Sequence, residues 1–432
     1  MLTAPEANAV ASRLVQQSAP ARVKLSILTR YMRGQQPEPW LPDGIDTEYR
    51  EIAKASASNW LQLVVRAVGQ GLIADGFGSL GESSRVWAEC WQANGMDARQ
   101  HGLNEAALVH GHAYLIVGMD GARRVLMRPE SAEHVSCEYE SPDDEWPTVA
   151  VRVLSNTRAE VYDAEARYTL IGNLGSATVT IDRHEFGVTP VAKVQADLSL
   201  LGSPQGEIAQ VIPIQNRIVD ATFNLQMVAK YGAFPQRWIS GITVNAGDPP
   251  VRAYVDSILT ADDPDTKFGQ FAPADLRQFI DALETHVRHL AAITQTPPHY
   301  LLGSMVNLSA DALAAAESGL QRKIRSRREM LAEGYESALR LAARGIGDEV
   351  TVNDPSAQLH WQDVESRSLA QTSDALLKLS QLGVPVEMLF RMIPGWTQTD
   401  AEEATQIAQS GGGLDALVRH LIDGTAPAPV GS

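Results

Sequence analysis

The sequence predicts an α+β fold in which helices come first, a largely antiparallel sheet follows, and long helices return. Up to about residue 110, apolar residues recur every three to four positions, as on the buried face of a helix. Between residues 112 and 191 the period shortens to two, with turn residues between the runs. Beyond residue 206 the helical period resumes. Helices and strands kept apart in this way are typical of α+β proteins.

The first 110 residues predict four helices. The second contains Asn59-Trp-Leu-Gln-Leu-Val-Val-Arg66, an amphipathic run with a wide apolar face. The third has Ser83 as its N-cap and carries Trp87 and Trp91, since a serine side chain satisfies free amides at a helix start. The first, second and fourth helices are expected over residues 5–33, 47–71 and 97–109, and a proline-containing connector over 35–46.

A hairpin opens the strand region. Residues 112–118 and 124–128 are the expected strands, and Met119-Asp120-Gly121 is the turn between them. Phe186-Gly187-Val188-Thr189-Pro190-Val191 closes the region. The strands expected between these two features are 149–154, 159–163, 168–171 and 177–181.

Residues 273–345 predict two long helices separated by an apolar loop. The first helix has an apolar stripe and stops at Pro297-Pro298, because proline lacks the amide donor and keeps its predecessor extended. After the loop, Ser309 is the expected N-cap of the second helix and Gly345 its C-cap. At about 1.5 Å per residue the second helix spans roughly 50 Å.

Another long helix, expected from residue 206 to about 231 with a kink at Pro213, precedes this pair. A small insert separates it from residue 273, with strands at 236–241 and 252–256 and an acidic loop at 260–268. Short helices close the chain. Their expected ranges are 366–382, 385–392 and 399–410, with 414–422 as a candidate fourth.

The composition narrows the class of protein. The 432 residues include 36 Lys and Arg against 52 Asp and Glu, a formal net charge of −16. Such a chain does not hold nucleic acid over its general surface, because phosphate binding needs clustered cations. The sequence contains no uninterrupted run of about 18 apolar residues, so no membrane span is predicted. Cys90 and Cys137 lack metal-type spacing, so free thiols are expected.

Candidate enzymatic features have simpler structural explanations. Residues 202–206 are not a nucleophile elbow, because the serine is one position off and a helix entrance explains them. His286 and His289 could ligate a metal, but a solvated or packed pair is favoured. His110 and His112 are expected to be structural. We therefore predict no enzyme, and no catalytic, cofactor-binding or metal-binding residue.

Two further features stay open at the level of the residues. The basic run comprises Arg322, Lys323, Arg325, Arg327 and Arg328. It fits a solvated face or salt bridges to a partner chain, or else contact with phosphates or an acidic neighbour, and contact between subunits is favoured because the chain is acidic overall. The loop 298–308 is either a buried plug or a projection of Leu302, Met305 and Val306 into a shared channel.

The order of these elements resembles the portal proteins of tailed bacteriophages, in the family usual in long-tailed phages. The resemblance covers about residues 20–410. The similar segments are 59–66 with Gly71, Gly76 and Phe77; 111–117 followed by Arg128-Pro129-Glu130; 186–191; Ser203-Pro204 before a long helix; 234–241; and 296–303.

The resemblance implies a division of the chain into portal parts. Residues 203–231 and 273–295 would be two stem helices, which line a channel. Residues 296–308 would be a tunnel loop that points at DNA. The remaining implied parts are a wing (1–202), a clip (232–272), a long wing-to-crown helix (309–345), C-terminal wing and crown helices (346–424) and a disordered tail (425–432).

The resemblance also implies a function and a set of site residues. About twelve copies would form a closed ring at one capsid vertex, assembled in the host cytoplasm, for double-stranded DNA to pass through. Its partners would be the terminase, the major capsid or scaffolding protein and the head-tail adaptor, with no membrane. The implied tunnel-loop residues are Pro298, His299, Tyr300, Leu301, Leu302, Met305, Val306 and Asn307, and the clip residues are Arg237, Trp238, Arg252, Tyr254, Asp262, Asp263 and Asp265.

Two alternatives from other classes remain at this point. The chain could be a minor capsid or head-completion protein that shares only the helical hairpin. It could also be a monomeric α+β enzyme with an unrecognised site.

Overall fold

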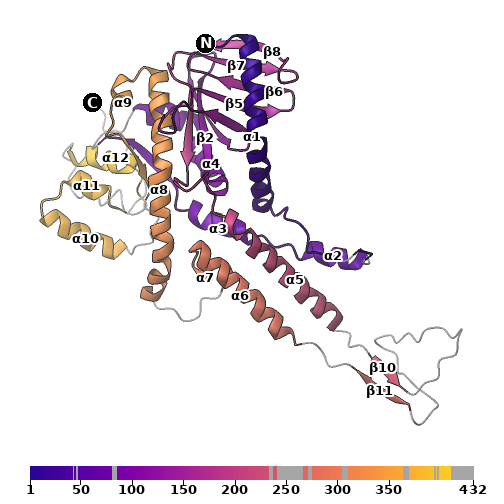
Figure 1. Cartoon of the computed structure of the whole chain (residues 1–432). Helices are drawn as coiled ribbons and strands as arrows, with labels where there is room; N and C mark the ends of the chain where they lie inside the picture. The colour runs from indigo at the N-terminus through magenta and orange to yellow at the C-terminus, as the bar shows by residue number, and fades with distance from the viewer. Residues whose placement is uncertain are drawn as a thin grey trace. The chain divides into compact units, whose positions relative to one another are not determined.

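The computed structural model has the α+β architecture that the sequence predicts (Figure 1). It describes residues 1–41, 43–44, 47–79, 85–232, 237–240, 266–270, 275–303, 310–362, 369–393, 396 and 398–409. The chain divides into two compact units, which are described separately. The first contains Met1–Thr29, Val65–Ala209 and Ser318–Ser432, and the second contains Arg30–Val64 and Gln210–Glu317.

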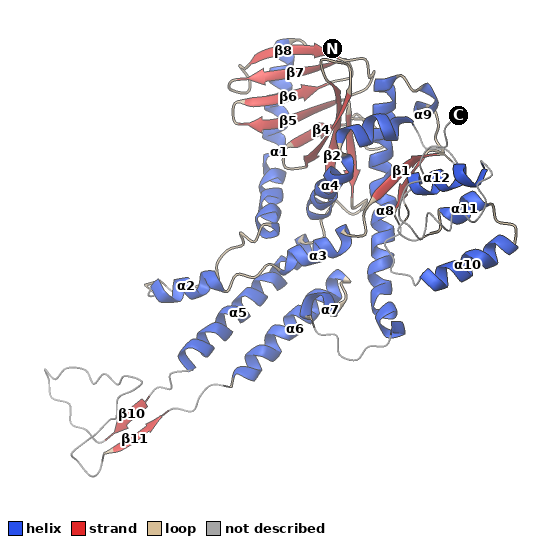
Figure 2. Cartoon of the chain, turned by 180° about the vertical axis from the view of Figure 1, so that it is seen from behind, coloured by secondary structure: helices blue, strands red, loops and turns tan. Residues whose placement is uncertain are grey.

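A five-stranded antiparallel sheet forms one layer of the first unit, with strand order β4-β5-β6-β7-β8 (Figure 2). The N-terminal part of helix α1 (Ala4–Met32) covers this sheet with Ala7, Ala11 and Leu14. Period-two alternation turns Val151, Val161, Tyr168 and Leu170 toward the helix. The strands are β4 (Val135–Glu138), β5 (Val149–Ser155), β6 (Arg158–Tyr162), β7 (Ala166–Ile171) and β8 (Thr178–Arg183).

A second antiparallel sheet of the same unit has the order β3-β2-β9. Its central strand β2 (His112–Met119) pairs with β3 (Val125–Ser131) and with β9 (Val191–Gln195). The carboxylate of Asp120 accepts hydrogen bonds from the amides of Ala122 and Arg124, which fixes the hairpin turn that the sequence predicts. Helix α4 (Met96–His110) packs on β2 and β3.

The long helix α8 (Ala310–Ile346) crosses from one unit to the other along the chain. In the first unit it packs closely on β9: a Cβ at Gly334 would lie 2.5 Å from the carbonyl oxygen of Lys193, so only glycine fits there. The buried Tyr335 donates its hydroxyl to Asn104 Oδ1 on α4 at 2.8 Å. Helix α8 is therefore a central packing element of this unit.

Two distant segments form a small sheet that the sequence does not predict. Strand β1 (Ala74–Gly78) pairs antiparallel with β12 (Gln358–Trp361), with Phe77 opposite Leu359. The remaining described helical elements of the first unit are the π-helix η1 (Trp87–Trp91), the 3-10 helix η2 (Gln92–Asn94), and α9 (Glu349–Val352), α10 (Leu369–Gln381), α11 (Val386–Phe390) and α12 (Gln398–Gln409). The 3-10 helix η3 (Ala209–Val211) lies at the boundary between the units.

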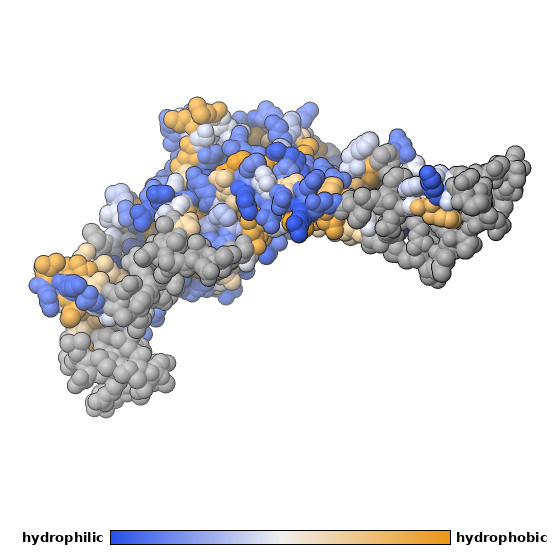
Figure 3. All heavy atoms as spheres, turned by 90° about the horizontal axis from the view of Figure 1, so that it is seen from below, coloured by the Kyte–Doolittle hydropathy of each residue, from blue (hydrophilic) through white to orange (hydrophobic). Residues whose placement is uncertain are grey.

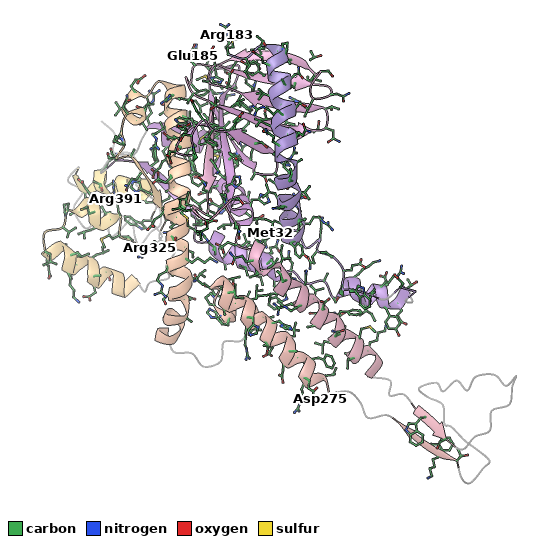
Figure 4. All side chains as sticks on the ribbon, viewed as in Figure 1. Met32, Arg183, Glu185, Asp275, Arg325 and Arg391 are labelled. Carbon is green, nitrogen blue, oxygen red and sulfur yellow. The ribbon has the colours of Figure 1, made fainter. Side chains whose placement is uncertain are left out.

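The second unit is built on two helices that pack side by side, α5 (Ile212–Gly232) and α6 (Leu276–Thr294). Asp275 caps α6 by accepting a hydrogen bond from the amide of Arg277 at 2.9 Å (Figure 4). Along the chain, α5 leads to β10 (Arg237–Ser240), and α6 follows the antiparallel partner strand β11 (Lys267–Gln270). The unit also holds α2 (Thr47–Ala55), the start of α3 (Trp60–Gly69) and α7 (Pro298–Leu302).

Several boundaries differ from the sequence prediction. The single helix expected over 47–71 is two helices, because Asn59 Oδ1 accepts the amide of Gln62 and so starts a new helix. Pro213 does not kink α5, since it lies in the first turn, where no amide donor is needed. The acidic loop expected up to residue 268 ends earlier, because Lys267 already belongs to β11. The predicted elements at 252–256 and 414–422 lie outside the described residues.

Candidate functional site

Several hydrogen bonds hold the C-terminal end of α6. Gln295 takes the left-handed conformation at φ +55, and the amide of Thr296 returns to the carbonyl of Ala291 at 3.0 Å. The buried hydroxyl of Thr294 donates to Leu290 and to Thr296. These contacts satisfy carbonyls that the proline stop leaves free, and they fix the direction in which the chain leaves the helix.

The first part of the predicted tunnel loop is a one-turn helix. Pro298 opens α7 at a position where proline is well tolerated, and Gly303 closes it at φ +65. The loop expected at 296–308 therefore begins with a rigid turn, because the two prolines and the glycine restrict the backbone.

Glu317 at the start of α8 contacts α7. Its Oε1 accepts a hydrogen bond from the Tyr300 hydroxyl at 3.3 Å and lies 3.7 Å from His299 Nε2. Burial raises the pKa of Tyr300, so the phenol stays protonated and remains a donor. The helical turn at the start of the predicted tunnel loop is thus joined to α8 through one carboxylate.

The tunnel-loop residues differ in exposure. Leu301 is buried, with 5% of its surface exposed, so its side chain packs within the chain. Tyr300 is 43% exposed and Leu302 half-buried. Met305, Val306 and Asn307 lie outside the described residues.

The predicted clip is described only at its two strands. Trp238 lies opposite Gly269, and a Cβ at Gly269 would lie 2.4 Å from the indole ring, so the ring covers the glycine. Trp238 and the neighbouring Phe268 remain 39% and 45% exposed. Arg237 begins β10, whereas Arg252, Tyr254, Asp262, Asp263 and Asp265 lie outside the described residues.

The basic run on α8 divides into two sets. Lys323 and Arg327 both pair with Glu207 of the same chain, at 2.5 and 2.8 Å. Arg328 donates to the carbonyls of Gly71 and Gln362 and lies over the ring of Trp361. These three side chains are therefore engaged within the first unit, and their contact with a partner chain or DNA stays a prediction.

Arg322 and Arg325 form the second set. Both are exposed, and among the described residues neither has an ion-pair partner (Figure 4 labels Arg325). A helix turns about 100° per residue, so adjacent positions in the run face different directions. Only these two members of the predicted set remain open to an outside partner.

The glycine-rich segment before α5 lies where two backbone segments approach closely. A Cβ at Gly206 would lie 1.8 Å from the carbonyl oxygen of Val109, and one at Gly111 would lie 2.7 Å from the backbone of Pro204. The two glycines let this segment press against the C-terminal end of α4. Close backbone packing therefore accounts for glycine at these two positions.

Among the histidine candidates, His110 has hydrogen-bond partners on both sides of its ring. His110 hydrogen-bonds Thr29 and Ser131 through its two ring nitrogens, and burial lowers its pKa. Burial lowers the pKa of His112 to about 3, with Lys193 adding to the effect. Burial lowers the pKa of His286 as well. Within the described ranges, no group of three or more His, Cys, Asp and Glu could hold a metal.

Both cysteines are free thiols, as expected. Burial raises the pKa of Cys90 and that of Cys137 to about 12, which makes both poor nucleophiles at neutral pH. No helix in the described part of the chain is long and apolar enough to span a membrane.

Sequence reasoning missed the part played by Glu207. This carboxylate follows Gly206 directly and is nearly buried. Its amide also donates to the carbonyl of Leu108. A lone glutamate after a glycine carries no signal of burial, so only its acidic charge and the basic run on α8 could have suggested the contact.

Comparisons with known proteins identify the family. The family model for phage portal proteins of the SPP1 Gp6-like type matches residues 78–412. The portal protein of Mycobacterium phage D29 is 27% identical over 348 residues, which cover 74% of this chain and 71% of that protein. The portal protein of Mycobacterium phage L5 is 26% identical over 375 residues, which cover 79% and 76%.

A solved structure, described as the neck of a native GTA particle computed with C12 symmetry, aligns at a TM-score of 0.45 and 11% identity. The alignment covers 83% of this chain and 95% of that one. The family match spans far more than half of the sequence and includes the three-stranded and five-stranded sheets, the paired helices and α8. The chain therefore belongs to the SPP1 Gp6-like family of phage portal proteins.

Proposed function

We propose that copies of this chain form a closed ring at one capsid vertex, through which double-stranded DNA enters during packaging and leaves during ejection. The observation that carries this proposal is the portal family match across residues 78–412. A ring of identical copies joined head to tail is closed by rotational symmetry, and about twelve copies are expected. The protein would be assembled in the host cytoplasm and retained at the portal vertex of the virion.

Charge supports a passive conduit. The net charge of −16 per chain is multiplied by the number of copies, so the ring as a whole repels phosphate. Repulsion keeps DNA from adhering, provided that cations facing the channel are few. Three of the five cations in the basic run are engaged within their own chain, and this fits the requirement.

Residues 296–308 are the proposed tunnel loop, with Tyr300 and Leu302 among the side chains available to the channel. The support is the helical turn α7, which follows the proline stop of α6 and is contacted by Glu317 through Tyr300. Leu301 is assigned to packing instead, because it is buried.

The strands β10 and β11 are proposed as the described part of a clip that docks the terminase first and the head-tail adaptor afterwards. The support is their position between α5 and α6 and the exposed aromatic side chains Trp238 and Phe268. Aromatic residues are enriched in protein interfaces, where their large surfaces are buried at low entropic cost. The proposed role includes no catalysis, and ATP hydrolysis belongs to the docked terminase.

Packaging in infected cells tests the proposal. Residues 304–308 are replaced by five alternating glycine and serine residues, which keeps α7 and its contact with Glu317. Assembled rings and heads that lack DNA are expected. Normal filling of heads by this variant would contradict the tunnel-loop assignment, and rings that fail to enter heads at all would favour a role in capsid completion.

A further inference from the structure

Three leucines project from one loop of the first unit. Leu198, Leu200 and Leu201 follow β9, and they are 52%, 101% and 99% exposed. We call residues 197–203 the leucine loop. Two adjacent leucines with no cover from their own chain are unusual, because water strongly favours burial of such side chains.

The base of the leucine loop is held firmly. The carbonyl of Gly111 accepts hydrogen bonds from the amides of Ala196 and Asp197, at 2.9 and 3.2 Å. The Asp197 carboxylate accepts the amide of Gln205 at 2.8 Å and so joins the two ends of the loop. Arg327 of α8 donates to the carbonyl of Ala196. The loop is therefore presented by a fixed base.

The leucines are not needed for the fold of their own chain. Side chains with about 100% exposure make no packing contacts, so they contribute nothing to the core of the first unit. Ala196, directly before the loop, is only 3% exposed, so burial ends where the leucine loop begins. Adjacent exposed apolar side chains on a fixed loop are typical of a protein contact.

The occupant is expected to be a second copy of this chain. A ring joined head to tail needs two different surfaces on each copy, one for each neighbour. The first unit carries a second exposed apolar surface, at the left of Figure 3, where α10 and α11 lie. Its members are Leu377, Leu382, Val386, Met388 and Met392. Methionine adapts well to a partner surface.

We propose that the leucine loop of each copy packs against the neighbouring copy in the ring, with Leu200 and Leu201 as the buried centre of the contact. This inference rests on the proposed function, because it requires the ring. It assigns to the segment between β9 and α5 a role in assembly, separate from passage of DNA.

Substitution tests the contact directly. The double variant Leu200→Glu with Leu201→Glu should keep the far-ultraviolet circular dichroism spectrum and the unfolding midpoint of the monomer. The protein concentration at which half of the chains are in rings should rise at least 10-fold. Ile171→Glu is the matched control, since Ile171 is 59% exposed at the end of β7 in the same unit. Unchanged assembly of the double variant would overturn the inference.

A photo-cross-linker identifies the occupant. Benzoylphenylalanine at position 201 in assembled rings should give covalent dimers of the chain after illumination, and the same group at position 171 should not. Cross-links only within one chain, or only to a different protein when capsid components are present, would overturn the inference. Wild-type chains that never form rings would remove the proposed function itself, whereas rings without cross-linked dimers would remove this inference alone.

Discussion

Lys323 Nζ lies 2.5 Å from Glu207 Oε2, and the two side chains are only 9% and 7% exposed. Arg327, one turn further along α8, contacts the other oxygen of the same carboxylate at 2.8 Å. A nearly buried carboxylate thus holds two cations and connects the segment before α5 to the long helix. In the proposed ring, this contact would hold α8 against the segment around Glu207.

Replacing Glu207 should destabilise the first unit. Glu207→Gln removes the negative charge that Lys323 and Arg327 share, and breaking a nearly buried ion pair typically costs about 3 kcal/mol. Urea unfolding of the monomeric chain, followed by fluorescence, measures the change in the free energy of unfolding. The control is Glu185→Gln, because its pair with Arg123 is 79% and 73% exposed and should change stability by less than about 0.5 kcal/mol. Equal stability of the two variants would contradict this account of Glu207.

Two glycines should respond to alanine in opposite directions. Gly206→Ala places a Cβ 1.8 Å from a backbone oxygen, so the segment must move away from α4, at a cost of at least about 2 kcal/mol. Gly102 lies inside α4 with open space around it, and Gly102→Ala should stabilise the chain by about 0.5–1 kcal/mol. Thermal unfolding of both variants measures the difference. A Gly206→Ala variant with the same thermal unfolding midpoint as the wild type would show that the close backbone approach is not required.

The stability of the first unit should depend on pH through Asp75. Burial raises the pKa of this carboxyl from 3.8 to about 6, and Asp400 on α12 adds to the rise while Arg328 opposes it. The folded chain therefore binds a proton between pH 4 and pH 6 that the unfolded chain has lost. Stability falls as pH rises through this window, and the carboxylate costs on the order of 3 kcal/mol above pH 6.

Asp75→Asn removes this cost and makes the prediction measurable. At pH 8 the variant should have a higher urea concentration at its unfolding midpoint than the wild type. At pH 4 the two midpoints should be the same. Unfolding curves across this range give the difference directly. A constant difference between the two proteins at all pH values would contradict an ionisation-based cost and would indicate a change of packing.

Thiol labelling tests the burial of the cysteines. With a pKa of about 12, the Cys90 and Cys137 thiols hold little thiolate at pH 8, so iodoacetamide should modify both far more slowly in the native protein than in guanidinium. Ser203→Cys, at an exposed position of the leucine loop, provides a fast-reacting control. Modification of Cys90 as fast as of the control would contradict the packing of the η1 region.

The local elements were predictable where one periodicity dominates. The alternation in β7 and the long stripe of α8 fix their type, because each buries one continuous face. The break between α2 and α3 was not predicted, since the apolar period continues across it and only Asn59 signals a cap. The pairing of β1 with β12 depends on segments about 280 residues apart, which no local pattern connects.

The candidate site was predicted less fully than the fold. The proline stop at residues 297–298 located the end of α6 correctly, because its cause is covalent and local. The basic run was recognised, but the partners of Lys323, Arg327 and Arg328 depend on how α8 packs. Exposure of Leu200 and Leu201 is likewise a property of the folded unit, because leucine in a sequence normally predicts burial.

The mass of the purified wild-type protein in solution tests the central claim most directly. Native mass spectrometry across a range of protein concentrations compares the assembled species with the chain mass of 46.8 kDa. The account predicts a closed species of about twelve chains, with no continuing series of larger oligomers, since a ring leaves no unpaired surface. A protein that remains a monomer at every concentration and salt condition would contradict it.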